Sequence, residues 1–174
     1  MNQVATIGYE GARPDDFIET LLQAGIEILV DVREVAMSRR KGFAKTALRE
    51  LLESNGIAYV HKRDLGDPKE GRDAARSGDF KKFRQIFNRH MRSAAAKHAL
   101  SELANLADDS FICLLCYERE PKNCHRSIVV DELVKVSKVE PVHLGVREGI
   151  SQVGEATKPK GRSGSAGQSI AACR

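Results

Sequence analysis

Two cysteines and a histidine in the second half of the sequence have residue types and a spacing suited to nucleophilic or acid–base chemistry. Cys116 is followed, after a short polar stretch, by the string Cys124-His125-Arg126. A cysteine at a helix start beside histidine and arginine can have a lowered pKa, and its thiolate is a nucleophile. Histidine exchanges protons near neutral pH. Cys116, Cys124 and His125 are therefore candidate catalytic residues, although a buried cysteine and a helix-capping histidine would give the same pattern.

The segment around Asn123 predicts an anion-binding helix start. We expect Asn123 to be the N-cap, which places Cys124, His125 and Arg126 in the first helical turn. Their backbone N–H groups would lack acceptors within the helix and could bind phosphate or sulfate. Arg126 would add a charge-assisted hydrogen bond to the same anion.

The cysteine spacing also raises the question of a metal site. Cys113 and Cys116 spell C-x-x-C, but residues three apart on a strand point to opposite faces and cannot share a metal. Cys116, Cys124 and His125 could meet across the loop, with His61 as a fourth ligand. Because the paired Cys/His clusters of a strong zinc signature are missing, we expect neither a metal nor a cofactor.

Further polar residues follow the predicted strands or lie in basic loops. Asp31 and Arg33 point to the same side after an apolar strand, where they could form a structural ion pair or bind a ligand. The run 38–43 is basic and contains a glycine, so it could contact phosphate or simply be a solvated loop. The candidate ligand-binding residues are Gly8, Tyr9, Glu10, Asp31, Arg33, Ser38, Arg39, Glu118 and Arg126.

Short apolar runs alternate with amphipathic stretches along the chain. We expect strands near 4–7, 28–32, 57–60, 111–116 and 139–144. We expect helices near 14–24, 47–54, 80–91, 95–107 and 128–136, and a long loop over 61–78. This order predicts an α/β, single-domain, Rossmann-like fold with a mostly parallel five-stranded sheet and helices on both faces. The expected strand order is 3-2-1-4-5.

In such a sheet, ligands bind beyond the carboxyl ends of the strands, where the strand order reverses. With the expected order, this crevice lies between the first and fourth strands. The loops 8–11 and 116–118 would border it, and the second strand would deliver Asp31 and Arg33.

Length and composition limit the class of protein. The chain has 174 residues, of which 41% are hydrophobic, and a net charge of +4. We expect one domain over 1–148 and a disordered, basic, Gly/Ser-rich tail over 149–174. No apolar run approaches a membrane span and the start lacks a signal-peptide pattern, so we expect a cytoplasmic protein without a membrane partner. The charge permits an anionic ligand, and the oligomeric state stays open.

Six short motifs, in order, resemble the bacterial family called domain of unknown function 488. They are Thr6-Ile7-Gly8-Tyr9-Glu10-Gly11; Leu29-Val30-Asp31-Val32-Arg33; Ser38-Arg39 with Gly42-Phe43; Gly56-Ile57-Ala58-Tyr59-Val60-His61; Leu65-Gly66-Asp67-Pro68; and Leu114-Leu115-Cys116-Tyr117-Glu118 with Cys124-His125-Arg126. The resemblance covers about residues 3–146 and implies an α/β fold with the motif residues around one cleft. It implies no established reaction. One departure is Glu34-Val35-Ala36-Met37, where the family commonly has a proline or a small residue.

A weaker resemblance is to rhodanese-like domains, which also have a strand ending in Asp-Val-Arg and a later strand ending in a reactive cysteine. Their anion loop closes with arginine six residues after that cysteine, where this chain has Lys122. We expect a cleft protein that binds or processes a phosphate-containing ligand, either a nucleotide or a nucleic acid. A thiol-dependent transferase or phosphatase is one alternative. A non-catalytic nucleic-acid-binding module, using the basic helix near 80–92, is another. Whether the protein is an enzyme stays open.

Overall fold

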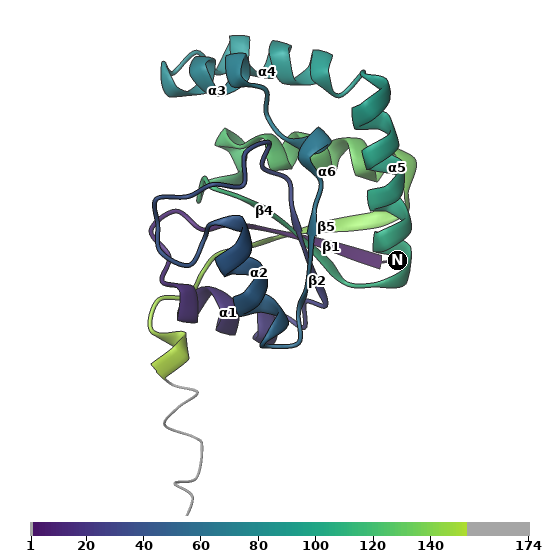
Figure 1. Cartoon of the computed structure of the whole chain (residues 1–174). Helices are drawn as coiled ribbons and strands as arrows, with labels where there is room; N and C mark the ends of the chain where they lie inside the picture. Colours follow the sequence, from purple (N-terminus) through teal and green to yellow (C-terminus); the bar gives the residue numbers. More distant parts are fainter. Residues whose placement is uncertain (1, 153–174) are drawn as a thin grey trace, which may run out of the picture.

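The structure, a computed structural model, describes residues 2–152 and has a five-stranded, all-parallel sheet (Figure 1). The strands are β1 (Asn2–Gly8), β2 (Ile28–Asp31), β3 (Ala58–His61), β4 (Ile112–Cys116) and β5 (Val139–Leu144). The expected α/β class with a five-stranded parallel sheet is therefore confirmed. The expected tail over 149–174 lies mostly outside the described residues.

Helices cover both faces of the sheet, as a parallel sheet with crossover connections requires. One face packs against α1 (Pro14–Gln23) and α2 (Lys45–Glu53), and the other against α5 (Ala94–Asp109) and α6 (His125–Val136). The helices α3 (Lys69–Arg76) and α4 (Phe80–His90) form an outer pair on the α5–α6 side, at the top of Figure 1. Among the described residues, no helix combines the length and apolar character needed to cross a membrane.

The strand order is β3-β2-β4-β1-β5, so the expected order 3-2-1-4-5 was wrong. The strand β4 lies between β2 and β1 and pairs in parallel with both. Every residue of β4 is buried, as a central strand requires, whereas β1 begins with exposed Asn2 and Gln3. The carboxyl end of β4 therefore lies between those of β1 and β2.

This order places a reversal on each side of β4. The chain leaves β1 and β2 toward α1 and α2 on one face and leaves β4 toward α6 on the other, so the connections reverse between β2 and β4 and also between β4 and β1. The crevice expected between the first and fourth strands therefore spreads over three strand ends, those of β2, β4 and β1.

The stretch 61–78 is not the single long loop that its sequence suggested. It contains a 3₁₀ turn, Arg63–Leu65, and the helix α3. Only Gly71 and Ala74 of α3 are buried, so this helix lacks the stripe of large apolar residues by which helices are recognised in sequences. It is held by packing against α4 and not by an apolar face of its own.

Alternation along β4 separates the two cysteines of the C-x-x-C string. Cys113 belongs to the hydrophobic cluster beneath α1 and α2, together with Leu115. Ile112 and Leu114 belong to the cluster on the opposite face. Cys116 is two residues beyond Leu114, so its side chain lies on the same face of the sheet as Leu114. There it lies beside Cys124 and His125 and not beside Cys113. The two thiols therefore point away from each other, as the spacing predicted.

Candidate functional site

A cavity of about 790 Å³ lies beyond the carboxyl ends of β1, β2 and β4. The strand ends form its floor, the loop after β2 and the loop after β4 form two walls, and α3 and α4 close a third side. Its lining residues are Tyr9, Glu10, Arg33, Glu34, Val35, Met37, Ser38, Arg39, Arg40, Asp67, Arg72, Ala75, Arg76, Phe80, Phe83, Cys116, Tyr117, Glu118, Glu120, Asn123 and His125. Parallel α/β sheets hold their ligands at this edge.

The structure brings most of the candidate residues to this cavity. Those that line it are Tyr9, Glu10, Arg33, Ser38, Arg39, Cys116, Glu118 and His125. Those that do not line it are Gly8, Asp31, Cys124 and Arg126. These four are buried directly behind the lining residues, so they shape the cavity without facing it.

Arg126 has a different position from the one its sequence suggested. Its side chain is fully buried, and its guanidinium donates hydrogen bonds to the carbonyl oxygens of Glu118 and Arg119 and to Thr6 Oγ1. Two of these acceptors are in the loop after β4, so Arg126 holds that loop in place from the protein interior. Arg126 does not line the cavity. The expected contact between Arg126 and an anion is therefore not available.

The start of α6 also differs from the expectation. Cys124 is the N-cap, and Asn123 belongs to a preceding 3₁₀ turn, Pro121–Asn123. The backbone N–H of Cys124 donates to the Pro121 carbonyl oxygen at 3.1 Å. The 3₁₀ turn therefore runs up to the N-cap, and Cys124 precedes the first helical turn.

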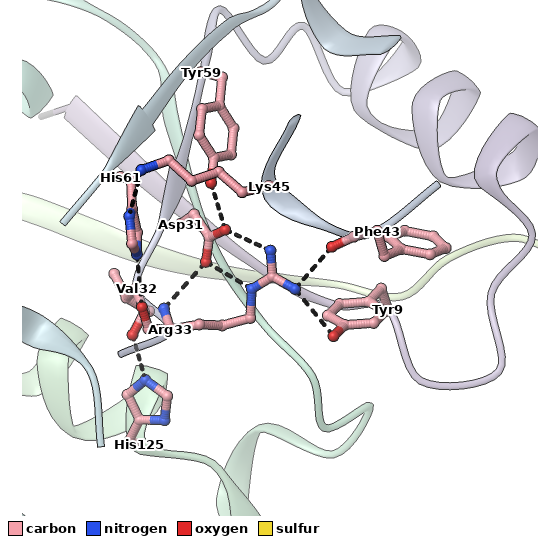
Figure 2. Close-up of polar contacts among 9 residues, drawn as sticks. All are labelled: Tyr9, Asp31, Val32, Arg33, Phe43, Lys45, Tyr59, His61 and His125. Atoms are coloured by element: carbon pink, nitrogen blue, oxygen red, sulfur yellow. Dashed lines mark hydrogen bonds and ion pairs between the residues drawn. The ribbon is translucent and has the colours of Figure 1, made fainter. Parts of the chain in front are cut away.

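Asp31 and Arg33 form a buried ion pair at the end of β2 (Figure 2). Arg33 Nη2 lies 2.5 Å from Asp31 Oδ2, and Arg33 Nε lies 2.8 Å from Asp31 Oδ1. The remaining donor, Nη1, contacts the Tyr9 hydroxyl at 3.0 Å and the Phe43 carbonyl oxygen at 2.9 Å. The Tyr59 hydroxyl donates to Asp31 at 2.7 Å. This network fixes the start of the loop that forms one cavity wall.

Both partners of Asp31 stay protonated. Burial opposes the charge of Arg33, but the hydrogen bond and the charge of Asp31 outweigh it and raise the pKa of Arg33. Burial and the Asp31 charge also raise the pKa of Tyr59. The carboxylate therefore receives donors from both sides, which a buried charge requires.

Cys116, Cys124 and His125 form a compact, buried group at the bottom of the cavity. The Cys116 Sγ lies 3.5 Å from His125 Nδ1, and the Cys124 Sγ lies 3.9 Å from the same nitrogen. His125 Nε2 lies 2.8 Å from the Val32 carbonyl oxygen, as Figure 2 shows. His61, considered in the sequence as a possible fourth metal ligand, contacts the Arg33 carbonyl oxygen and Lys45 instead.

Burial opposes an ionised thiol in this group. It raises the pKa of Cys116 and raises that of Cys124 well above the ordinary value. Burial also acts to lower the pKa of His125, but its neighbours Cys124, Val32 and Asp67 together outweigh it and raise that pKa. The Cys116 thiol donates to Glu118 Oε2 at 3.1 Å, which favours its protonated form.

Asp67 lines the cavity but is not among the candidate residues predicted from the sequence. It is 5% exposed, and its Oδ1 has no hydrogen-bond partner among residues 2–152. Burial is the main cause that raises the pKa of Asp67 to about 6, while His125 and Arg72 act to lower it. The available signal was the Gly66-Asp67-Pro68 string inside an unexplained long stretch. Unexplained polar residues in long loops are often functional.

Two glycines allow the cavity loops to approach each other. A Cβ atom on Gly8 would lie 1.8 Å from the Glu118 carbonyl oxygen. A Cβ atom on Gly66 would lie 2.1 Å from the Glu34 backbone nitrogen. Any side chain at either position would push a cavity wall outward, so both contacts depend on glycine.

Aromatic rings form part of the cavity surface. Tyr9 is buried and stacks on Phe43 with ring centroids 4.5 Å apart, and it meets Tyr117 edge to face. Tyr117 is 43% exposed and Phe80 is 41% exposed. Tyr117 lies in the loop after β4 and Phe80 begins α4. Both rings line the cavity and are accessible to a ligand.

Comparison with known proteins gives one family. A family model described as domain of unknown function DUF488 matches residues 13–133. No curated protein and no solved structure gives a significant match. The matched range contains every candidate residue except Gly8, Tyr9 and Glu10.

Proposed function

The chain belongs to the family described as domain of unknown function DUF488, and from its cavity we propose that it binds a phosphate-containing ligand of the nucleotide type. The observation that carries the proposal is one cavity, at the carboxyl ends of a parallel sheet, that combines accessible aromatic rings with accessible arginines. A nucleotide presents a planar base and an anionic phosphate. A cavity of about 790 Å³ lies within the usual range for small-molecule sites and can hold a nucleotide.

The arginines support the phosphate half of the proposal. Arg39 is exposed, lines the cavity and makes no hydrogen bond or ion pair within residues 2–152. Arg40 beside it donates one N–H to the Ala12 carbonyl oxygen, which fixes its position and leaves its other donors for a ligand. Arginine donors bind phosphate oxygens in a bidentate manner. These two arginines support a phosphate position at the loop after β2.

The aromatic rings and Asp67 support the base half. Tyr117 and Phe80 are accessible, and stacking between an aromatic ring and a base tolerates any base. Asp67 offers a carboxylate oxygen that has no partner among the described residues, and it can accept a hydrogen bond from a base amino group. A ligand that satisfies this oxygen removes the cost of burying it.

The alternatives receive less support from the same residues. A thiol nucleophile needs a populated thiolate near neutral pH, and burial raises the pKa of both Cys116 and Cys124. The exposed basic side chains of α4 give only weak support to nucleic-acid binding, because solvated basic faces are common on proteins. A nucleotide at the end of a nucleic acid would present the same phosphate and base to the cavity.

A thermal-shift series tests the proposal and separates these sources. The probes are the four ribonucleoside monophosphates, inorganic phosphate, and short oligonucleotides with and without a 5′-phosphate. We expect at least one nucleotide, free or at a phosphorylated end, to raise the melting temperature, because a ligand at 100 times its Kd adds about 2.7 kcal/mol to the free energy of unfolding. The proposal fails if none of the phosphate-bearing probes does so.

Two arginine variants locate the effect. Arg39→Gln should weaken binding of the stabilising probe by about 10-fold or more, because it removes a charge-assisted contact. Arg49→Gln is the matched control, since Arg49 is exposed on α2 and does not line the cavity. Equal affinities in both variants would place the phosphate elsewhere.

A further inference from the structure

We propose that Cys116, Cys124 and His125 bind a zinc ion at the bottom of the cavity, with its fourth position open toward Glu118. This inference concerns the buried group and goes beyond ligand binding by the arginines and rings. It also replaces the expectation from the sequence that the chain holds no metal.

The separations between the three ligand atoms match those around tetrahedral zinc. Zinc–sulfur bonds of about 2.3 Å and zinc–nitrogen bonds of about 2.0–2.1 Å put sulfur and nitrogen about 3.6 Å apart on a tetrahedron. The observed distances from His125 Nδ1 are 3.5 Å to Cys116 Sγ and 3.9 Å to Cys124 Sγ. All three ligand atoms lie within 4.8 Å of one another, so one ion can contact all of them.

The outer contact of His125 has the form that zinc-binding histidines show. Such a histidine donates its second ring N–H to a carbonyl or carboxylate oxygen, which fixes the ring and leaves the first nitrogen free for the metal. The Nε2 atom of His125 lies 2.8 Å from the Val32 carbonyl oxygen at the end of β2 (Figure 2). Its Nδ1 then faces the two sulfur atoms.

The ligands come from rigid parts of the fold. Cys116 is the last residue of β4, Cys124 is the N-cap of α6, and His125 is the first residue of that helix. The loop between them is held from behind by the hydrogen bonds of Arg126 to the Glu118 and Arg119 carbonyl oxygens. Both cysteines are free thiols and are less than 5% exposed. A site formed in this way is preorganised before the metal arrives, as tight binding requires.

Two of the three proposed ligands, Cys116 and His125, line the cavity, which leaves room for a fourth ligand on that side. The Glu118 Oε2 lies 3.1 Å from Cys116 Sγ, and Glu118 lines the cavity. Zinc sites with three protein ligands and an open fourth position are typical of catalytic zinc, which can hold water or a ligand oxygen there. The two thiolates would neutralise the ion, so its burial needs no further charge. The proposed zinc ion therefore belongs to the open class and not to the closed structural class.

Metal analysis of the full chain tests the site. The reduced protein is incubated with zinc in slight excess, desalted, and analysed by inductively coupled plasma mass spectrometry. We expect about one zinc ion per chain, and we expect Co²⁺ in its place to give the thiolate charge-transfer and d–d absorption bands of a tetrahedral site. A desalted protein that holds less than about a tenth of an equivalent, or a cobalt spectrum without thiolate bands, would overturn the proposal.

Variants then identify the ligands. Cys116→Ser and Cys124→Ser should each weaken zinc binding at least 100-fold in competition with a chromophoric chelator, and His125→Ala should do the same. Cys113→Ala and Cys173→Ser are the controls and should keep the cobalt spectrum. Circular dichroism checks the fold of each variant. Full retention of zinc by a folded Cys116→Ser or Cys124→Ser chain would overturn the assignment, and the spectrum of the unmodified protein decides the matter if those variants do not fold.

Discussion

Asp67 shows how one buried carboxylate can make stability depend on pH. Burial raises its pKa to about 6, above the value of about 3.9 for an unfolded chain. The folded state therefore holds this proton more tightly than the unfolded state. The free energy of unfolding contributed by Asp67 is fully present below about pH 4, and it is lost as the pH rises toward 6.

Asp67→Asn should remove this loss. We expect the stability of the variant relative to the parent protein to increase by about 2 kcal/mol between pH 4 and pH 8, because one pKa unit corresponds to about 1.4 kcal/mol. Urea unfolding of both proteins across this range provides the measurement. Asp73→Asn, at an exposed carboxylate of α3, is the control and should follow the parent protein. A constant difference between Asp67→Asn and the parent would contradict the assignment.

Residue types were easier to predict than residue roles. The sequence marked polar positions after β1, β2 and β4, where polar residues interrupt apolar runs, and most of these residues lie at one cavity. It could not distinguish Arg126 from Arg39, since both arginines lie within motifs. Their roles depend on which carbonyl oxygens lie within reach of each guanidinium. Arg126 has three protein acceptors around it, while Arg39 has none among the described residues.

At the scale of elements, the contact between β1 and the loop after β4 depends on one missing side chain. A methyl group at Gly8 would lie 1.8 Å from the Glu118 carbonyl oxygen, which is backbone and cannot move away cheaply. The loop that carries Glu118 would have to shift. The same loop connects Cys116 to Cys124, so a shift here reaches the proposed zinc ligands.

Gly8→Ala should therefore destabilise the protein by about 2 kcal/mol or more, in the upper part of the range for overpacked sites. Gly145→Ala is the matched control, because no atom lies within 4 Å of its added methyl group. Chemical denaturation of the two variants and the parent gives the comparison. Equal stabilities for Gly8→Ala and Gly145→Ala would show that the loop adapts without cost.

The helix α3 marks the limit of element prediction from this sequence. A helix such as α1 can be predicted from its apolar residues at helical spacing, here Phe17, Ile18 and Leu21. The buried positions of α3 are Gly71 and Ala74, which carry almost no hydrophobic signal. Its position is decided by contact with α4, which is a tertiary effect that local patterns do not contain.

At the scale of the whole molecule, the end of the described chain is attached to the first helix. The Asp16 carboxylate on α1 accepts hydrogen bonds from the backbone N–H groups of Gly149 and Ser151 and from the Ser151 hydroxyl. These bonds lower the pKa of Asp16. Ile150 between them is 9% exposed. These contacts continue past residue 148, where the domain is expected to end.

Two shortened chains test this attachment. A chain that ends at Gln152 should melt at the temperature of the full chain, whereas one that ends at Glu148 should melt lower, because Asp16 loses all three donors. Calorimetry at pH 7 compares them. The difference should shrink as the pH falls through the lowered pKa of Asp16, since a protonated carboxyl group no longer needs these donors. Equal melting temperatures at pH 7 would support the domain boundary at residue 148 and contradict the attachment.

The strand order was the main global feature that the sequence did not determine. Connection rules favour neighbours in sequence as neighbours in space, which placed β1 beside β2. The apolar run 111–116 predicts a buried strand, but burial on both faces indicates only that this strand is central. Its exact place depends on pairings across long sequence separations, such as Val30 with Leu114, which local patterns do not reveal.

The central place of β4 has a consequence for synthesis on the ribosome. The strands β1, β2 and β3 are made first, but β1 and β2 pair with β4 and not with each other. A nascent chain therefore cannot join its first two strands correctly until residue 116 has left the exit tunnel. Until then the facing edges of β1 and β2 are free to pair wrongly, in the order 3-2-1. Translation speed across the helices between β3 and β4 thus decides how long the growing chain is exposed to this mispairing.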